Sequence, residues 1–473
     1  MKEIHMLTYS FENREHTSLY EHLYKQIKTD ILDGTLTPDE KLPSKRTLAE
    51  HLNISTITVE NAYNQLMAEG YIYSKPKSGF FVSHITSAQS EYAHSDVSFP
   101  ETDPARPQTS YFADFVSNST AKQSFPFNMW SKLMRKTMSE NVDKLMIHSP
   151  SIGVWELRRE IAKYLLQFRG MNVSPEQIVI GAGTEYLYGI IIQLLGRHRI
   201  YAVENPGYQK IKKIYSSNDV SCIHLPMDKH GISIKALEQS QAQVLHISPS
   251  HHFPTGIVTP IARRYELLSW ASKSSDRYII EDDYDSEFRF MGKPIPSLQS
   301  IDVMEKVIYI NTFSKSLSST IRISYMVLPK NLMERYNQEL NFYACTVSNF
   351  DQYTLASFLA EGHFEKHINR MKNFYRSQRD LIMDCIKKHP KYSRVKIAEE
   401  NSGLHFLLHV DTALSDEALV QKAKEHDIHI SCLSQYFYQP EEHSLPHTLL
   451  LNYSGIPSEK IPRAIELLFD SLW

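Results

Sequence analysis

The sequence reads Val307-Ile308-Tyr309-Ile310-Asn311-Thr312-Phe313-Ser314-Lys315, an apolar run that leads directly into two hydroxyls and a lysine. Lys315 comes 33 residues after Asp282, which lies in the acidic cluster Glu281-Asp282-Asp283-Tyr284. A lysine that holds a carbonyl cofactor as a Schiff base needs a strand end, hydroxyls for a phosphate and a carboxylate for a ring nitrogen. All these groups are present, so the spacing predicts a pyridoxal 5'-phosphate (PLP) site with Lys315 as its catalytic residue.

Other apolar runs also end in groups that suit this cofactor. A glycine-containing turn at 181–184 precedes a helix, and the N–H groups of such a turn favour a phosphate. An aromatic ring after a Pro-Gly turn can cover a flat cofactor, and a histidine can bind its phenolic oxygen or a substrate. Each feature alone is also explained by a tight turn, by core packing or by a structural histidine. The predicted cofactor-binding residues are Lys315, Asp282, Tyr284, Tyr208, Ala182, Gly183, Thr184, Thr312, Ser314, Arg322 and His251.

The large C-terminal part alternates short apolar runs with helical patterns from about residue 150 onward. This alternation predicts an α/β fold, a parallel or mixed sheet covered by helices. In such sheets ligands bind beyond the carboxyl ends of the strands, which is where the predicted PLP residues fall.

The N-terminal part has the pattern of a winged helix-turn-helix, mainly α with a β wing. Leu19, Leu23, Ile27 and Ile31 recur at four-residue spacing, which predicts a first helix with one buried stripe. Ser44 and Ser55 are suitable caps for two further short helices. A hairpin with a basic tip follows at 71–82.

On this scaffold the third helix enters the major groove of DNA while basic side chains meet phosphates. Residues 17–86 hold seven Lys or Arg and eight Asp or Glu, so DNA binding must depend on where the charges lie rather than on net charge. An interaction module without a nucleic-acid partner is the alternative. The predicted DNA-binding residues are Lys45, Arg46, Ser55, Thr56, Thr58, Lys75 and Lys77.

The chain is therefore predicted to be multidomain: a winged helix over residues 1–86, a polar and proline-containing linker over 87–110, and a cofactor-binding domain over 111–473. The 473 residues are 42% hydrophobic and 22% charged, and they contain no run long enough to cross a membrane. The N-terminus lacks the apolar core of a signal peptide, which favours a cytoplasmic location. Four scattered cysteines and 22 histidines show no metal-ligand spacing, so no metal site is predicted.

Two stretches of the sequence resemble known families. Lys41 to Ala49, together with 68–72 and 78–82, is similar to the GntR-type winged helix, and the motifs around Tyr208, His251, Asp282 and Lys315 resemble a fold-type I aminotransferase. The combination resembles the MocR/GabR regulators over almost the whole chain. The resemblance implies a small C-terminal α/β subdomain at about 345–473 and a domain-swapped, head-to-tail homodimer.

The same resemblance implies a role for each residue of the predicted PLP site. It places Lys315 on the cofactor aldehyde, Asp282 at the pyridine nitrogen, Tyr284 at the ring oxygen and Tyr208 over the ring. The residues that it places around the phosphate are Ala182, Gly183, Thr184, Thr312, Ser314 and Arg322.

The sequence departs from the family pattern at several positions. Leu450 stands where aminotransferases commonly carry an arginine for the substrate carboxylate, and His148 stands where many relatives have a tyrosine. Thr56 replaces the arginine that usually follows the serine of the recognition helix. Lys210 is a replacement cation for the carboxylate or an ordinary solvated helix lysine.

Three functions fit these observations. The first is a PLP-dependent transcriptional regulator that binds operator DNA and senses PLP or an amino compound, with little or no transaminase activity. The second is an active aminotransferase with an appended DNA-binding domain, against which Leu450 argues. The third is a DNA-binding regulator whose large domain only dimerises, against which the complete lysine site argues. The effector, the promoter and the sign of regulation stay open.

Overall fold

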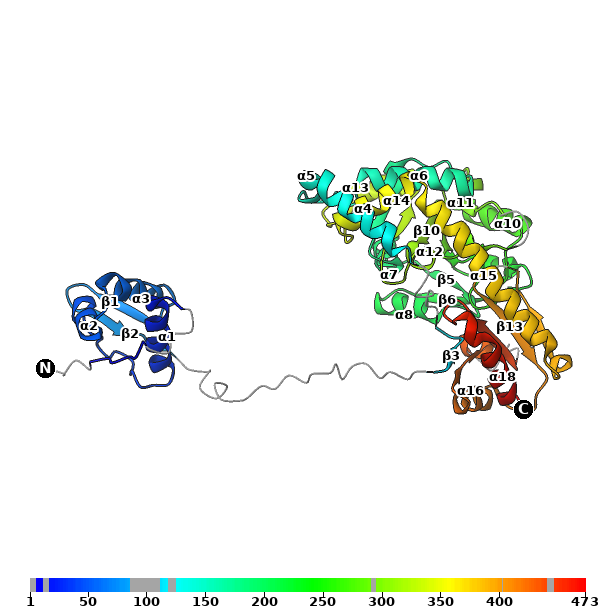
Figure 1. Ribbon diagram of the computed structural model, residues 1–473. Coiled ribbons are helices and arrows are strands. Elements are labelled where there is room, and N and C mark those ends of the chain that lie inside the picture. Colours follow the sequence, from blue (N-terminus) through cyan, green and yellow to red (C-terminus); the bar gives the residue numbers. More distant parts are fainter. Residues whose placement is uncertain are drawn as a thin grey trace. The chain divides into compact units, whose positions relative to one another are not determined.

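The computed structural model describes residues 6–11, 17–85, 111–117, 125–290, 295–401, 403–439 and 446–473. The chain divides into two compact units, Met1–Gln108 and Thr109–Trp473. The predicted linker at 87–110 lies outside the described residues. Figure 1 shows the elements of each unit.

The N-terminal unit is a winged helix, as the sequence predicts. Its elements are α1 (Leu19–Leu32), α2 (Lys45–Leu52), α3 (Thr56–Ala68), β1 (Ile72–Lys75) and β2 (Gly79–Val82). The buried stripe of α1 packs on Leu48, Val59 and Leu66 from α2 and α3. Ser44 and Ser55 cap α2 and α3 through their side chains, and Asn53 adopts a left-handed conformation between the two helices. β1 and β2 pair antiparallel and form the wing.

The second unit is built on a mixed eight-stranded sheet of order β4-β11-β10-β9-β8-β5-β6-β7. β10, β9, β8, β5 and β6 run parallel, and β11 runs antiparallel to both β10 and β4. The strands are β4 (Ile178–Gly181), β5 (Tyr201–Asn205), β6 (Cys222–Asp228), β7 (Gly231–Ile232), β8 (Val244–Ile247), β9 (Tyr278–Asp283), β10 (Val307–Thr312) and β11 (Ser324–Val327). The predicted α/β fold is confirmed.

Helices cover both faces of this sheet. The helices of this part of the chain are α4 (Phe127–Glu140), α5 (Val142–Leu145), α6 (Trp155–Arg169), α7 (Thr184–Leu195), α8 (Gln209–Ser217), α9 (Ile234–Gln239), α10 (Ile261–Ser272), α11 (Leu298–Ile301), α12 (Phe313–Ser316), α13 (Lys330–Glu339) and α14 (Asn349–Ala360). Ile280 packs with α7 and α13 on one face, while the adjacent Ile279 packs with α10 on the other. Burial on both faces explains why consecutive residues of the central strands, such as Ile279 and Ile280, are apolar.

A smaller C-terminal layer follows the long helix α15 (His363–Lys388), which appears in yellow in Figure 1. Its sheet has the order β12-β13-β16-β15, and β14 pairs separately with β3. Its elements are β3 (Ala113–Asp114), β12 (Val395–Ala398), β13 (His405–Val410), α16 (Asp416–Glu425), β14 (Ile428–His429), β15 (Ser431–Cys432), β16 (Thr448–Asn452) and α18 (Ile461–Ser471).

The long helix α15 contributes to two cores. Ile368 of α15 packs with Leu355 and Phe358 of α14 in the core around α4 and α6. Met371 of α15 belongs to the core of the small layer, which also includes Ala113 of β3. Among the described residues, no helix has the length and apolar character needed to span a membrane.

Candidate functional site

A cavity of about 280 Å³ opens beyond the carboxyl ends of the parallel strands. β9 and β10 are paired in register, with Ile310 opposite Asp282, so both strands deliver their following residues to the same edge. Eight predicted PLP residues line the cavity: Thr184, Tyr208, Asp282, Tyr284, Thr312, Ser314, Lys315 and Arg322. Ala182, Gly183 and His251 lie next to this set but are not among the lining residues.

Lys315 lies on the short helix α12, immediately after β10. Burial lowers the pKa of its amine to about 8, although Asp285 acts in the opposite direction. About a tenth of this lysine is therefore neutral at pH 7, far more than of a lysine with an ordinary pKa, and the neutral amine is the state that attacks a carbonyl.

Asp282 is buried at the end of β9 between a tyrosine and a histidine. Tyr188 of α7 donates a hydrogen bond to its Oδ2 at 2.5 Å, and His246 Nε2 of β8 lies 3.6 Å from the same oxygen. The other oxygen, Oδ1, is buried and has no hydrogen-bond partner among the described residues. A buried carboxylate oxygen normally has a donor, so this atom fits a protonated ring nitrogen.

Tyr284 connects the cavity to a polar group beneath it. Its hydroxyl lies 3.2 Å from Nδ1 of His251, and the same nitrogen lies 2.8 Å from Asp285 Oδ2. Burial raises the pKa of Tyr284 well above its usual value, so the hydroxyl remains a donor. His251 sits so close to Gly403, with φ of 71°, that a Cβ there would lie 1.8 Å from the imidazole. The structure thus places His251 behind Tyr284, where it orients that hydroxyl.

Hydroxyl groups gather at the lysine end of the cavity. Thr312 accepts a hydrogen bond from the Ser314 N–H at 3.1 Å and caps α12. Ser324 of β11 donates to the same Thr312 oxygen at 2.8 Å. These contacts fix the turn that presents Ser314 and Lys315.

Arg322 and the N-terminus of α7 form the cationic end. Arg322 has φ of 52° and forms an ion pair with Glu185 at 2.6 Å, and Lys210 pairs with the same carboxylate. A Cβ on Gly183 would lie 2.2 Å from the Arg322 guanidinium, so the glycine permits this approach. The Ala182 N–H already donates to Thr346 at 2.9 Å. A phosphate at this end is left with the N–H groups that open α7, the Ser314 hydroxyl and Arg322.

Tyr208 lies at the mouth of the cavity, and 47% of its surface is exposed. It contacts Phe253 edge to face at 5.6 Å. Below it, His252 Nε2 lies 3.4 Å from Glu204. Burial lowers the pKa of His252 to about 3 and raises that of Glu204 to about 8, so this pair is neutral at physiological pH.

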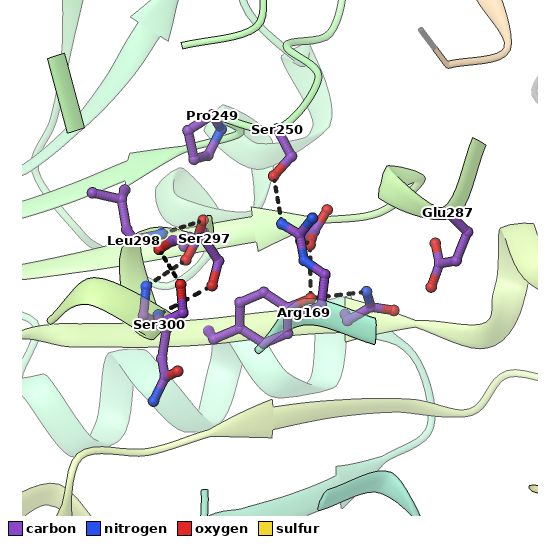
Figure 2. Close-up of polar contacts among 12 residues, drawn as sticks. Arg169, Pro249, Ser250, Glu287, Ser297, Leu298 and Ser300 are labelled. Carbon is purple, nitrogen blue, oxygen red and sulfur yellow. Dashed lines mark hydrogen bonds and ion pairs between the residues drawn. The ribbon is translucent and has the colours of Figure 1, made fainter. Parts of the chain in front are cut away.

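Arg169 holds the loop after β8 from below, as Figure 2 shows. It donates to Ser250 Oγ at 2.9 Å and pairs with Asp283 at 3.0 Å, and Tyr309 donates to Asp283 at 2.7 Å. Burial lowers the pKa of Arg169, but Asp283 and other neighbours raise it by more. This buried ion pair ties the end of α6 to β9 and to the loop that carries His251.

Sequence reasoning did not assign roles to Tyr188, His246, Glu204 or Arg169. One local signal was present for Tyr188, which lies four residues after Thr184 and therefore on the same helix face. His246 and Glu204 lie within buried strands, and nothing in the sequence shows which strands become neighbours.

Leu450 and His148 are the two residues near the substrate end that depart from the aminotransferase pattern. Leu450 of β16 is buried in a small apolar cluster with Leu407, Leu433 and Phe437. His148 is exposed on this chain. Neither residue presents a cation to the cavity.

The predicted DNA-binding residues lie on α2, α3 and the wing. Arg46, Ser55, Thr56 and Lys77 are exposed, whereas Lys45 is paired with Glu60 at 2.7 Å. The hydroxyls of Ser55 and Thr58 lie 2.7 Å apart in the cap of α3, and Lys75 covers the rings of Tyr73 and Phe81. The free cations of this surface are thus fewer than the sequence suggests.

Comparison with known families assigns both units. Residues 19–82 match "Bacterial regulatory proteins, gntR family", and residues 118–468 match "Aminotransferase class I and II".

Similar proteins include the HTH-type transcriptional regulator YdeL of Bacillus subtilis, which is 38% identical over 95% of this chain and 96% of its own length. The HTH-type pyridoxine biosynthesis transcriptional regulator PdxR of Corynebacterium glutamicum is 29% identical over 89% of this chain and 90% of its own. A kynurenine aminotransferase of Pyrococcus horikoshii shares the fold, with a TM-score of 0.67 and 22% identity over 77% of this chain and 91% of its own.

Proposed function

The chain belongs to the MocR/GabR type of helix-turn-helix transcriptional regulators, in which a gntR-family winged helix precedes an aminotransferase class I and II domain, and we propose that its large domain binds PLP to control DNA binding. The main support for the proposal is that one cavity is lined both by Lys315, whose amine has a lowered pKa, and by the buried carboxylate of Asp282. The expected signal is PLP itself or an amino compound that combines with it.

When bound, PLP supplies an electron-accepting ring and an aldehyde that reacts with amines. Lys315 would hold the aldehyde carbon through its neutral amine. Asp282 would hold the ring nitrogen, while Tyr188 and the nearby His246 keep the carboxylate in place. Tyr284 would donate to the ring oxygen, and Tyr208 would cover the ring.

The phosphate end of the cavity requires a rearrangement of charge. Lys210 and Arg322 both contact Glu185. These two cations lower the pKa of the Glu185 carboxyl below its usual value, although burial acts in the opposite direction. Glu185 is therefore charged, and a phosphate would compete with it for Arg322. This competition links phosphate binding to the position of α8, which carries Lys210.

The large domain is proposed to sense rather than to turn over its ligand. Leu450, buried among leucine and phenylalanine side chains, offers no cation for a substrate carboxylate. Continuous conversion of an amino acid to a keto acid, lost in the Lys315→Ala variant, would contradict this proposal.

We also place the regulator in the cytoplasm, because its DNA partner is there, and expect it to act as a domain-swapped homodimer. A dimer supplies two N-terminal winged-helix units, here called heads, one for each half-site of the operator. Ligand control requires that two arrangements of the dimer differ in their affinity for the ligand.

The test of the proposed function is the effect of PLP on DNA affinity. Full-length protein freed of PLP and the same protein reloaded with PLP are expected to differ at least about fivefold in Kd for an operator duplex, the lower end of common allosteric couplings. Pyridoxine 5'-phosphate, which lacks the aldehyde, serves as the control ligand, and a panel of amines tests for a second signal. Equal affinity and an equal footprint for both forms would remove the sensing role.

The rate of PLP capture is expected to depend on pH. Only the neutral amine of Lys315 reacts, and its pKa is about 8. The neutral fraction, and with it the rate at fixed PLP, therefore rises about tenfold from pH 7 to pH 9. Stopped-flow absorbance measures this rate. A rise of about a hundredfold over the same range, with no levelling below pH 10, is the profile of an ordinary lysine and would contradict the lowered pKa.

A further inference from the structure

The outer face of α3 is a stripe of uncharged side chains. Val59, Ala62, Tyr63 and Leu66 are buried on its inner face. At 100° per residue, Ile57, Asn61 and Asn64 fall on the opposite side, and all three are exposed. This stripe is the part of a recognition helix that faces base edges.

Ile57 stands out on this stripe. It is the second residue of α3, and 69% of its surface is exposed. Among the described residues of the head, the other exposed large hydrophobic side chains are Met6 at 40% and Tyr20 at 36%. Ile57 contributes little to the head's core, so its position offers a contact to the partner rather than to the fold.

Three polar side chains near Ile57, those of Ser55, Thr58 and Glu60, are occupied within the head, whereas Thr56 is exposed. The Ser55 oxygen accepts from the Thr58 N–H at 3.1 Å and lies 2.7 Å from the Thr58 hydroxyl. Glu60, the charged residue within Thr56–Ala68, is bound to Lys45 at 2.7 Å. The reading face thus presents no arginine or lysine to guanine and no free carboxylate to cytosine.

We propose that this stripe reads A·T base pairs, with Ile57 packed on the 5-methyl group of thymine and Asn61 bound to adenine. Thymine alone offers a methyl group in the major groove, and an asparagine side chain matches the N6 and N7 groups of adenine. The two residues are one helical turn apart, about 6 Å along the axis, which is nearly two base steps. Each half-site of the operator is therefore expected to contain a thymine that contacts Ile57 and, about two base steps away, an adenine that contacts Asn61.

The experiment uses the full-length protein and a duplex that it selects from a random-sequence pool. Each thymine of the selected duplex is replaced in turn by deoxyuridine, which lacks only the 5-methyl group. One thymine per half-site is expected to show a Kd about fourfold weaker, the value for one apolar carbon group of about 0.8 kcal/mol. The Ile57→Ala variant is expected to bind the thymine and uracil duplexes equally.

Matched variants separate base reading from general affinity. Lys77→Ala is expected to weaken binding to all duplexes while the thymine-to-uracil ratio stays as in the wild type. Asn61→Ala is expected to lose the penalty for 7-deazaadenine at the second position.

The inference rests on DNA binding by the head, and the two can fail separately. If a duplex is selected but uracil is tolerated at every thymine, or if Ile57→Ala keeps the wild-type ratio, the A·T reading is overturned while DNA binding stands. If no duplex is selected, both are overturned.

Discussion

The Lys315→Ala variant is expected to purify without a visible PLP band and to bind operator DNA with the same affinity whether or not PLP is added. Lys315 follows the carboxyl end of β10 and lines the same cavity as Asp282, and burial lowers the pKa of its amine to about 8. Removal of its amine leaves PLP with reversible contacts only, through the phosphate and the ring nitrogen. The loss of the band is expected to be complete, and absorbance together with borohydride trapping and peptide mass spectrometry measures it.

The control for this variant is Lys330→Ala. Lys330 is a lysine on α13 with 73% of its side chain exposed, and its removal tests for nonspecific trapping of aldehyde on surface amines. This control is expected to keep the band and the adduct on the Lys315 peptide. An adduct on another lysine, or a wild-type band in the Lys315→Ala protein, would show that the cofactor is attached elsewhere.

Local patterns in the sequence predicted most of the fold. The stripe of α1, the serine caps at 44 and 55 and the wing hairpin each depend on residues within a few positions of one another. The ends of β9 and β10 were predictable for the same reason, because a buried strand followed by polar residues is a local signal.

The remaining features depend on which distant segments become neighbours. Tyr188 reaches Asp282 across 94 positions of the chain, and Ser250 meets Arg169 across 81. The position of His251 behind Tyr284 depends on a glycine at 403 that allows the close approach. Pairing of Lys45 with Glu60 removes a cation that the sequence assigned to a phosphate. No short-range pattern contains these contacts.

The Arg169→Met variant is expected to lose about 3–5 kcal/mol in free energy of unfolding, the usual effect of removing one partner of a buried ion pair. The side chains of Arg169 and Asp283 are 4% and 1% exposed, so the variant would leave the Asp283 carboxyl in a dry site without its cation, and the Tyr309 hydroxyl would be its remaining donor among the described residues. Urea unfolding followed by tryptophan fluorescence measures the change, because the four tryptophans (130, 155, 270 and 473) all lie in the large unit.

A second variant separates the ion pair from the packing of the arginine stem. Asp283→Asn keeps an oxygen for Tyr309 and removes the charge, so the double variant Arg169→Met with Asp283→Asn is expected to be more stable than the sum of the single losses predicts, by about 0.5–3 kcal/mol. Arg159→Gln, on the same helix but with 49% of the side chain exposed, is expected to change stability by less than about 1 kcal/mol. Additive losses at 169 and 283 would mean that Arg169 acts through its volume alone, and the loop that carries Ser250 and His251 would then be held by packing rather than by charge.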